Sequence, residues 1–279
     1  MFSAPVNRII PFSSVDGPGN RMAIFLQSCP FQCWYCHNPE TINLCVHCGI
    51  CVTKCPSNAL SVIDGKVVWN SLHCTQCDTC IKICPTLSSP KITRFTVDEM
   101  MIKIDEVRPF IRGITLSGGE CMTYPEFMEG IFTQTKKMGL SCLIDSNGYR
   151  LFSDYPQLMK VCDGVMLDVK AVDSEFHLQL THHTNEIVLK NLEDLLLMGK
   201  LQEVRIVVLP GYDAQNKITI AYVAEHVKNK AKIKLLTYRP YGVRKVGLDK
   251  LGTSMLSEKE MEFYRQFALE NGASDVIIL

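Results

Sequence analysis

Residues 29–36 read CPFQCWYC, which places Cys29, Cys33 and Cys36 in the pattern C-x3-C-x2-C, with the aromatic residue Tyr35 directly before the last cysteine. Three thiolates can bind three irons of a 4Fe–4S cube and leave the fourth iron open to a substrate. Structural zinc sites instead use four ligands, usually as two separated pairs. The stretch therefore predicts a catalytic iron–sulfur cluster on these three cysteines.

Eight further cysteines follow in two runs that share the spacing C-x2-C-x2-C-x3-C-P. This is the run of bacterial two-cluster ferredoxins, in which the fourth cysteine of each run binds the other cluster. The spacing predicts one 4Fe–4S cluster on Cys45, Cys48, Cys51 and Cys84, and a second on Cys74, Cys77, Cys80 and Cys55. Zinc is the alternative, but three cysteines at two-residue gaps suit it poorly. We expect the remaining cysteines to be ordinary buried thiols: Cys121, Cys142 and Cys162.

Composition limits the remaining possibilities. The chain has 279 residues, of which 47% are hydrophobic, with 29 basic and 29 acidic residues. Balanced charge gives no excess to attract nucleic acid or an anionic membrane. No apolar run approaches the roughly 20 residues that span a bilayer, and the first residues lack the features of a signal peptide. We expect a cytoplasmic monomer whose cysteines serve as metal ligands rather than in disulfides.

Beyond residue 90, apolar runs alternate with helical stretches. Strands are expected at 21–27, 114–116, 142–144, 165–167, 204–209, 233–237 and 276–279, and helices at 96–110, 125–138, 186–197, 218–229 and 257–270. Thr96 with Glu99, and Ser257 with Glu260, form capping boxes. Such alternation predicts a parallel sheet. Four polar motifs follow its strands, where binding residues collect: SGGE, DSNG, DVK and PGYD.

A family resemblance rests on these motifs. Residues 16–40, DGPGNRMAIFLQSCPFQCWYCHNPE, closely resemble the start of pyruvate formate-lyase activating enzyme and other activating enzymes of glycyl radical enzymes, which are radical S-adenosylmethionine (SAM) enzymes. SGGE, DSNG, DVK and VVLPG follow in the family's order. The phrases IDGKVVWN, CTQCDTC and VCDGVMLDVKA resemble its YjjW type. The resemblance covers essentially the whole chain.

The resemblance implies an α/β fold, a partial (β/α)6 TIM-like barrel. Its radical SAM core would comprise residues 1–40 and 91–279. Residues 41–90 would form a ferredoxin-like insert that carries two 4Fe–4S clusters, which brings the expected total to three clusters.

The resemblance also implies a SAM site. Residues expected there are Tyr35, His37 and Asn38 near the adenosine, Gly118, Gly119 and Glu120 near the methionine amino group, and Asp145, Asp168 and Lys170 around the carboxylate. Arg205 matches a site arginine on the following strand. Asp145 and Asp168 would also hold a monovalent cation. Arg239 stands where relatives have a histidine that contacts SAM, so its contact is an open expectation. The pair His182–His183 lies in a polar stretch and is expected at the surface.

The activity implied is that of an anaerobic activating enzyme, an oxidoreductase. It would cleave SAM reductively to a 5′-deoxyadenosyl radical and install a glycyl radical on a partner glycyl radical enzyme. A ferredoxin or flavodoxin would supply the electron. Two alternatives stay open: a radical SAM enzyme that acts on a small molecule or another peptide, and an electron-transfer iron–sulfur protein.

Overall fold

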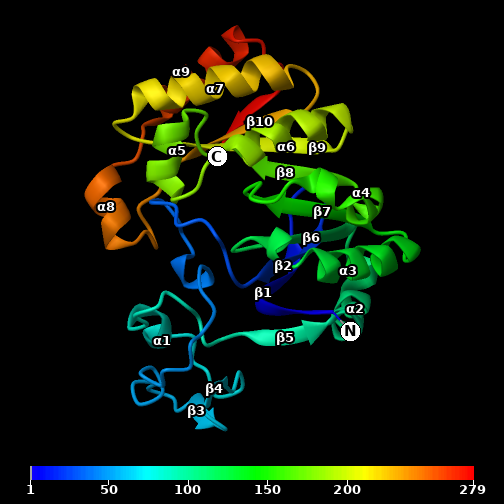
Figure 1. Ribbon diagram of the computed structural model, residues 1–279, viewed down its shortest axis with the longest axis vertical. Coiled ribbons are helices and arrows are strands. Elements are labelled where there is room, and N and C mark those ends of the chain that lie inside the picture. Colours follow the sequence, from blue (N-terminus) through cyan, green and yellow to red (C-terminus); the bar gives the residue numbers. More distant parts are fainter. Residues whose placement is uncertain (1) are drawn as a thin grey trace.

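The computed structural model describes residues 2–279 and consists of one large sheet with helices around it and a small projecting segment (Figure 1). The sheet has nine strands in the order β11-β10-β9-β8-β7-β6-β2-β1-β5. Every neighbouring pair from β11 to β2 is parallel, whereas β1 pairs antiparallel with both β2 and β5. The chain thus has the expected α/β fold, with a mostly parallel sheet consistent with a partial barrel.

The parallel strands fall where the apolar runs predicted them. Their bounds are β2 Arg21–Leu26, β6 Gly113–Gly118, β7 Ser141–Ser146, β8 Gly164–Asp168, β9 Leu201–Val208, β10 Lys232–Thr237 and β11 Val276–Ile278. Central residues such as Ile24, Leu116 and Ile144 are fully buried. Burial on both faces explains why these strands read as continuous apolar runs.

Helices cover the outside of this sheet (Figure 1). Their bounds are α2 Val97–Val107, α3 Pro125–Lys137, α4 Pro156–Val161, α5 Ser174–Thr181, α6 Glu186–Leu197, α7 Asp213–Val227, α8 Lys245–Leu251 and α9 Glu258–Glu270. Both predicted capping boxes are present, at the starts of α2 and α9. Within residues 2–279, we find no helix with the length and apolarity needed to cross a bilayer.

Helix α7 begins at Asp213, five residues before the predicted start at Ile218. Its first turn is polar and gives no amphipathic signal. Asn216 explains the early start: it is 4% exposed, its Oδ1 accepts from Leu209 N (3.0 Å), and its Nδ2 donates to Leu209 O (2.8 Å). The end of β9 thus stabilises the first turn of α7 through a tertiary contact that sequence periodicity does not report.

Five elements of the core were not predicted: β1 Ser3–Ser13, β5 Thr93–Thr96 and the short helices α4, α5 and α8. Strand β1 contains two prolines, and its pairing with β2 is interrupted between Val6 and Arg8 and again between Ile10 and Ser13. Proline and bulges both weaken the alternation by which strands are recognised. Helices α4, α5 and α8 are too short to show a clear period.

The segment between β2 and β5 projects from the end of the molecule below β5 in Figure 1. It contains the antiparallel hairpin of β3 Leu60–Ile63 and β4 Lys66–Trp69, and the short helix α1 Thr79–Lys82. Its small separate core is formed by Cys51, Leu60, Val67 and Cys80. Both cysteine runs lie in this segment.

Candidate active site

The loop that carries Cys29, Cys33 and Cys36 is fixed by its main chain. Immediately after β2, Ser28 N donates to Thr41 O (2.8 Å) and Cys29 N to Ile42 O (2.9 Å), which closes the loop on itself. Farther along, Gln32 N and Trp34 N donate to the last carbonyls of α5, Thr181 O and Leu180 O. These backbone hydrogen bonds at both ends of the loop fix the arrangement of its three thiols.

Aromatic side chains pack around Phe31 of the loop. Phe31, 2% exposed, stacks on His183, with ring centres 5.3 Å apart, and meets Tyr149 and His177 edge-on. The expectation that His182–His183 lies at the surface is therefore wrong for His183, which is half-buried, and right for His182, which is exposed. Helix α5 turns back after Thr181 and brings His183 under the loop.

Helix α8 approaches the same loop closely. A Cβ on Gly247 would lie 1.9 Å from Trp34 O, so only glycine fits there. The Trp34 ring packs against Phe176 and Tyr212, and Arg244 Nη2 donates to Gln32 O (2.9 Å). The loop is therefore enclosed between α5 and α8.

The SGGE motif binds the cysteine loop through the backbone. Gly119 N donates to Leu26 O (2.9 Å) and Glu120 N to Ser28 O (2.8 Å). A Cβ on Gly119 would lie 2.4 Å from Ser28 O, and Gly118 has a φ of +127°. Both positions therefore require glycine, and here the close neighbour is the backbone that leads into Cys29.

The carboxylate of Glu120 is buried and joins two motifs. Its oxygens accept from Met122 N (2.9 Å), Ser146 Oγ (2.8 Å) and Asn147 N (2.8 Å). Burial raises the pKa of Glu120 to about 7, although these donors oppose the shift. Glu120 thus fixes the SGGE loop to the DSNG loop.

Asn147 is a site residue that the sequence did not single out. Its Nδ2 lies 3.5 Å from Cys29 Sγ. Taken alone, DSNG predicts a turn, and the structure has one: Gly148 adopts a φ of +73°, and Tyr149 N donates to Asn147 Oδ1 (3.0 Å). No pattern in the sequence signals that the other half of the amide faces a thiol.

Lys170 and Asp168, both expected around the methionine carboxylate, lie together, and Tyr35, expected near the adenosine, lies beside them. Lys170 Nζ lies 3.0 Å from Asp168 Oδ2 and 5.4 Å from the centre of the Tyr35 ring. Burial lowers the pKa of Lys170, but Asp168, Tyr35 and Cys33 together outweigh it and the net shift is well upward, so the ammonium stays charged. The Tyr35 hydroxyl is buried and has no partner of hydrogen-bond geometry among residues 2–279.

Asp145 and Arg205 form the second buried charge cluster. Arg205 Nη1 lies 3.0 Å from each oxygen of Asp145, and Ser117 Oγ donates to Asp145 Oδ2 (2.9 Å). Arg205 Nε also donates to Glu203 (2.7 Å), which in turn pairs with Lys234 (2.7 Å). Burial raises the pKa of Asp145 despite the opposing charge of Arg205.

The three thiols lie beside these charges. Burial raises the pKa of Cys33 to about 11, although the charge of Lys170 opposes this. Burial also raises the pKa of Cys29 well above its ordinary value, and the neighbouring Cys33 adds to the shift. Thiolates at these positions therefore need a cationic partner such as iron.

Three predicted residues are less closely integrated. His37 is exposed, and its Nε2 lies 2.8 Å from the carbonyl oxygen of Arg239. Asn38 is exposed and precedes the short turn Pro39–Thr41. Arg239 is exposed, and its residue borders a surface hollow beside the start of α9. Only the backbone of Arg239 meets the cysteine loop here, so a contact of its side chain with SAM stays a prediction.

The eight cysteines of the projecting segment line two small hollows. Cys45, Cys48, Cys51 and Cys84 line the first, and Cys55, Cys74, Cys77 and Cys80 line the second, while Cys80 also borders the first. Each hollow therefore draws its fourth cysteine from the other run, as the ferredoxin rule predicts. All eight cysteines are free thiols. Cys121, Cys142 and Cys162 are buried, as expected.

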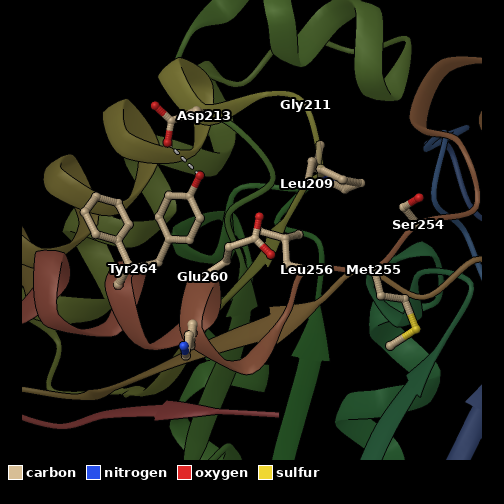
Figure 2. Close-up of a pocket in the computed structure, with 11 residues that line it drawn as sticks. Leu209, Gly211, Asp213, Ser254, Met255, Leu256, Glu260 and Tyr264 are labelled. Atoms are coloured by element: carbon tan, nitrogen blue, oxygen red, sulfur yellow. Dashed lines mark hydrogen bonds between the residues drawn. The ribbon is translucent and has the colours of Figure 1, made fainter.

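A further hollow, shown in Figure 2, lies at the end of β9. Residues of the β9–α7 loop, such as Leu209 and Gly211, face Met255 and Leu256 across it, and Tyr264 donates to Asp213 (2.8 Å) at its edge (Figure 2). It contains no cysteine and none of the predicted site residues. The chemistry predicted from the sequence therefore belongs to the cysteine loop and not to this hollow.

Comparison with known proteins agrees with this geometry. The radical SAM superfamily matches residues 23–222. The choline trimethylamine-lyase activating enzyme of Oleidesulfovibrio alaskensis is 30% identical over 87% of this chain and 86% of its own length. The chain belongs to the radical SAM activating enzymes of glycyl radical enzymes.

Two further comparisons cover nearly the whole of this chain. A putative glycyl-radical enzyme activating enzyme of Haemophilus influenzae is 28% identical over 99% of this chain and 96% of its own length. The crystal structure of QueE from Escherichia coli has a TM-score of 0.55 at 13% identity, covering 99% of this chain and 94% of that one, which is a likeness of fold alone. The radical SAM fold and the activating function predicted from the sequence are thus confirmed: this enzyme generates a radical from SAM and installs a glycyl radical on a partner enzyme. The finer YjjW assignment stays a prediction.

Proposed function

We propose that Cys29, Cys33 and Cys36 hold the 4Fe–4S cluster whose open iron binds SAM. The main support is the enclosed cysteine loop, beside which lie the ammonium of Lys170 and the carboxylates of Glu120 and Asp168. When bound and reduced, the cluster supplies the electron that cleaves the sulfonium of SAM, and the adenosyl fragment takes a hydrogen atom from a glycine of the partner.

The residues of the chain would orient SAM by charge. Lys170 stays protonated because its pKa is raised, so it can pair with the methionine carboxylate. Asp168 and Tyr35 fix the position of the Lys170 ammonium. Gly118 and Gly119 leave the backbone near the thiols without side chains, open to the methionine amino group, and Glu120 orders that loop. The buried Tyr35 hydroxyl without a partner supports the fit of a polar ligand at this place. His37, Asn38 and Arg239 would line the outer, adenosine side.

A monovalent cation beside Asp145 and Asp168 would complete the site. Asp145 already accepts two contacts from Arg205, and Asp168 pairs with Lys170. A cation there would share these carboxylates with the two side chains. The proposed cation belongs to the SAM-bound state.

We also propose that residues 41–90 carry two further 4Fe–4S clusters, for three in all. Within residues 2–279, no three His, Cys, Asp or Glu side chains gather closely enough to hold a single metal ion. A four-iron cube needs a different arrangement, in which each thiolate binds its own iron, and the two cysteine-lined hollows support it. Trp69 borders the second hollow, and its buried Nε1 lacks a partner among the described residues, so it could donate to a cluster sulfur.

The test is made without oxygen. Purified, reconstituted enzyme should bind about twelve irons per chain, as three cubes require. After reduction by dithionite it should form 5′-deoxyadenosine from SAM, and a co-incubated glycyl radical enzyme should acquire the doublet of a glycyl radical in its electron paramagnetic resonance (EPR) spectrum. A full set of clusters without either product would overturn the assignment of the SAM site.

The insert should act in electron delivery from a ferredoxin or flavodoxin. Replacing Cys74 with Ala is expected to slow SAM cleavage driven by a reduced flavodoxin by about tenfold or more, which is ~1.4 kcal/mol in activation free energy. Cleavage driven by dithionite, which can reduce the catalytic cluster directly, should stay within about twofold of wild type. Equal rates for wild type and variant with both reductants would contradict the relay.

A monomer in the cytoplasm completes the proposal. Because the partner is itself an enzyme, the glycine that reacts must reach the cysteine loop as part of a protein chain. Sedimentation of the reconstituted enzyme, alone and with a glycyl radical enzyme, tests the monomer and the complex together.

A further inference from the structure

Among residues 2–279, Asn147 is the one side chain outside the predicted set that directs a hydrogen-bond donor at a thiol of the cysteine loop. Asn147 is 6% exposed, and its Nδ2 lies 3.5 Å from Cys29 Sγ. The distance suits a hydrogen bond to sulfur, which is longer than one to oxygen. Neither the SAM site nor the ferredoxin insert assigns this residue a role.

The orientation of the amide is fixed by its other contacts. Asn147 Oδ1 accepts from Tyr149 N (3.0 Å), so the nitrogen of the same amide must be the atom that faces Cys29. The backbone N–H of Asn147 donates to Glu120 Oε2 (2.8 Å). Because Glu120 N also donates to Ser28 O (2.8 Å), the donor and the cysteine are anchored to the same carboxylate residue.

A second buried amide holds the loop that carries this donor. Asn191 of α6 is fully buried, and its Nδ2 donates to Gly148 O (3.0 Å) and Arg150 O (2.8 Å), while its Oδ1 accepts from Phe152 N (2.9 Å). Residues 147–152 are therefore held on both sides. The N–H group is in place before any ligand binds.

We propose that Asn147 is a positioning residue that donates a hydrogen bond to the Cys29 ligand of the catalytic cluster and thereby makes the cluster easier to reduce. The inference rests on the proposed function, because it requires a cluster on Cys29, Cys33 and Cys36. An N–H donor stabilises negative charge on a ligand sulfur, and the reduced cluster carries one more negative charge than the oxidised one. Hydrogen bonds to sulfur are among the factors that set cluster potentials.

Two variants separate the donor from the turn. Asn147→Asp keeps an oxygen to accept from Tyr149 N and so keeps the turn, but it loses the N–H donor and adds a negative charge; the shift must therefore also be present in Asn147→Ala, which adds no charge. Asn147→Ala loses both. Ser146→Ala is the matched control, because it removes two hydrogen bonds of the same loop, to Glu120 and from Gly148 N, without touching the thiol.

The measurement is the midpoint potential of the catalytic cluster in the whole reconstituted enzyme, followed by EPR. The catalytic signal is the one that a Cys29→Ala/Cys33→Ala/Cys36→Ala variant lacks. We expect this potential to shift to more negative values in Asn147→Asp and Asn147→Ala, and to stay at the wild-type value in Ser146→Ala. The signals of the insert should not move in any of the three.

The outcomes distinguish a failure of the proposed catalytic cluster from a failure of the proposed role of Asn147. If the triple cysteine variant keeps every signal of the wild type, the proposed catalytic cluster is wrong and the role of Asn147 falls with it. If the catalytic signal exists but its potential is unchanged in Asn147→Asp, only the role of Asn147 is overturned, and the residue serves the turn alone. An equal shift in Ser146→Ala would likewise overturn it.

Discussion

Enzyme carrying Cys33→Ser should lose SAM cleavage by about a thousandfold or more, which corresponds to ~4 kcal/mol in activation free energy. Cys33 is 7% exposed and lies between the other two thiols of the loop, so no other cysteine can replace it. Serine has nearly the same shape but offers a hard oxygen in place of the soft sulfur that iron–sulfur clusters need. The readout is 5′-deoxyadenosine formed under dithionite.

The matched control is Cys142→Ser. Cys142 lies on β7 and is fully buried, and among residues 2–279 its thiol makes one hydrogen bond, a weak one to Phe132 O (3.9 Å). It makes the same chemical change at a thiol outside all three cysteine groups. We expect near wild-type iron content and cleavage within about threefold, or ~0.7 kcal/mol. A loss equal to that of Cys33→Ser would mean that serine acts by damaging the fold and not by removing a ligand.

The sequence predicted the parallel strands well because those at the centre of the sheet, such as β2, β6 and β8, are buried on both faces and therefore largely apolar. It failed for β1, whose prolines and bulges break the alternation, and for the first turn of α7, which depends on the contact between Asn216 and Leu209. Such tertiary contacts leave no mark in local periodicity. The capping boxes at Thr96 and Ser257 were recognised because they are local by nature.

The candidate site likewise has features that the sequence predicted and features that it did not. Cysteine spacing specifies ligands directly, so the residues around both insert hollows could be assigned from the sequence. Motif order predicted that Asp168 and Lys170 lie in one place, but not that Tyr35, which we expected near the adenosine, lies beside them. It could not reveal that Glu120 faces the DSNG loop, or that Asn147 turns its amide to Cys29, because these contacts join loops that are distant along the chain. The tight fit of Gly247 against Trp34 is of the same kind.

The second large effect is expected for Arg205→Met, which should lower the free energy of unfolding by about 3–5 kcal/mol, the usual result of breaking a buried ion pair. Arg205 is 15% exposed and contacts both Asp145 and Glu203. Glu203 keeps Lys234 in the variant, but Asp145 is left buried without a counter-charge. Denaturant unfolding of the reconstituted enzyme under nitrogen measures the loss.

Adding Asp145→Asn to Arg205→Met should recover a large part of this loss, because the neutral amide no longer needs a cation and can still accept from Ser117. The pH dependence has a definite sign. Burial raises the folded-state pKa of Asp145 above the ordinary value, and loss of Arg205 raises it further, so the folded variant binds an extra proton between the unfolded pKa, about 3.9, and the raised one. The deficit of Arg205→Met should therefore grow as the pH rises through that folded-state pKa and shrink as the pH falls toward 3.9.

An exposed ion pair provides the comparison. Lys217 and Asp213 lie 2.9 Å apart but are 38% and 62% exposed, so Lys217→Met should cost less than about 1 kcal/mol. If both substitutions cost the same, burial would not be what makes the Asp145–Arg205 pair important. If the double variant were as unstable as Arg205→Met, the loss would come from packing of the arginine and not from the stranded carboxylate. The charge cluster would then serve SAM binding more than the stability of the sheet.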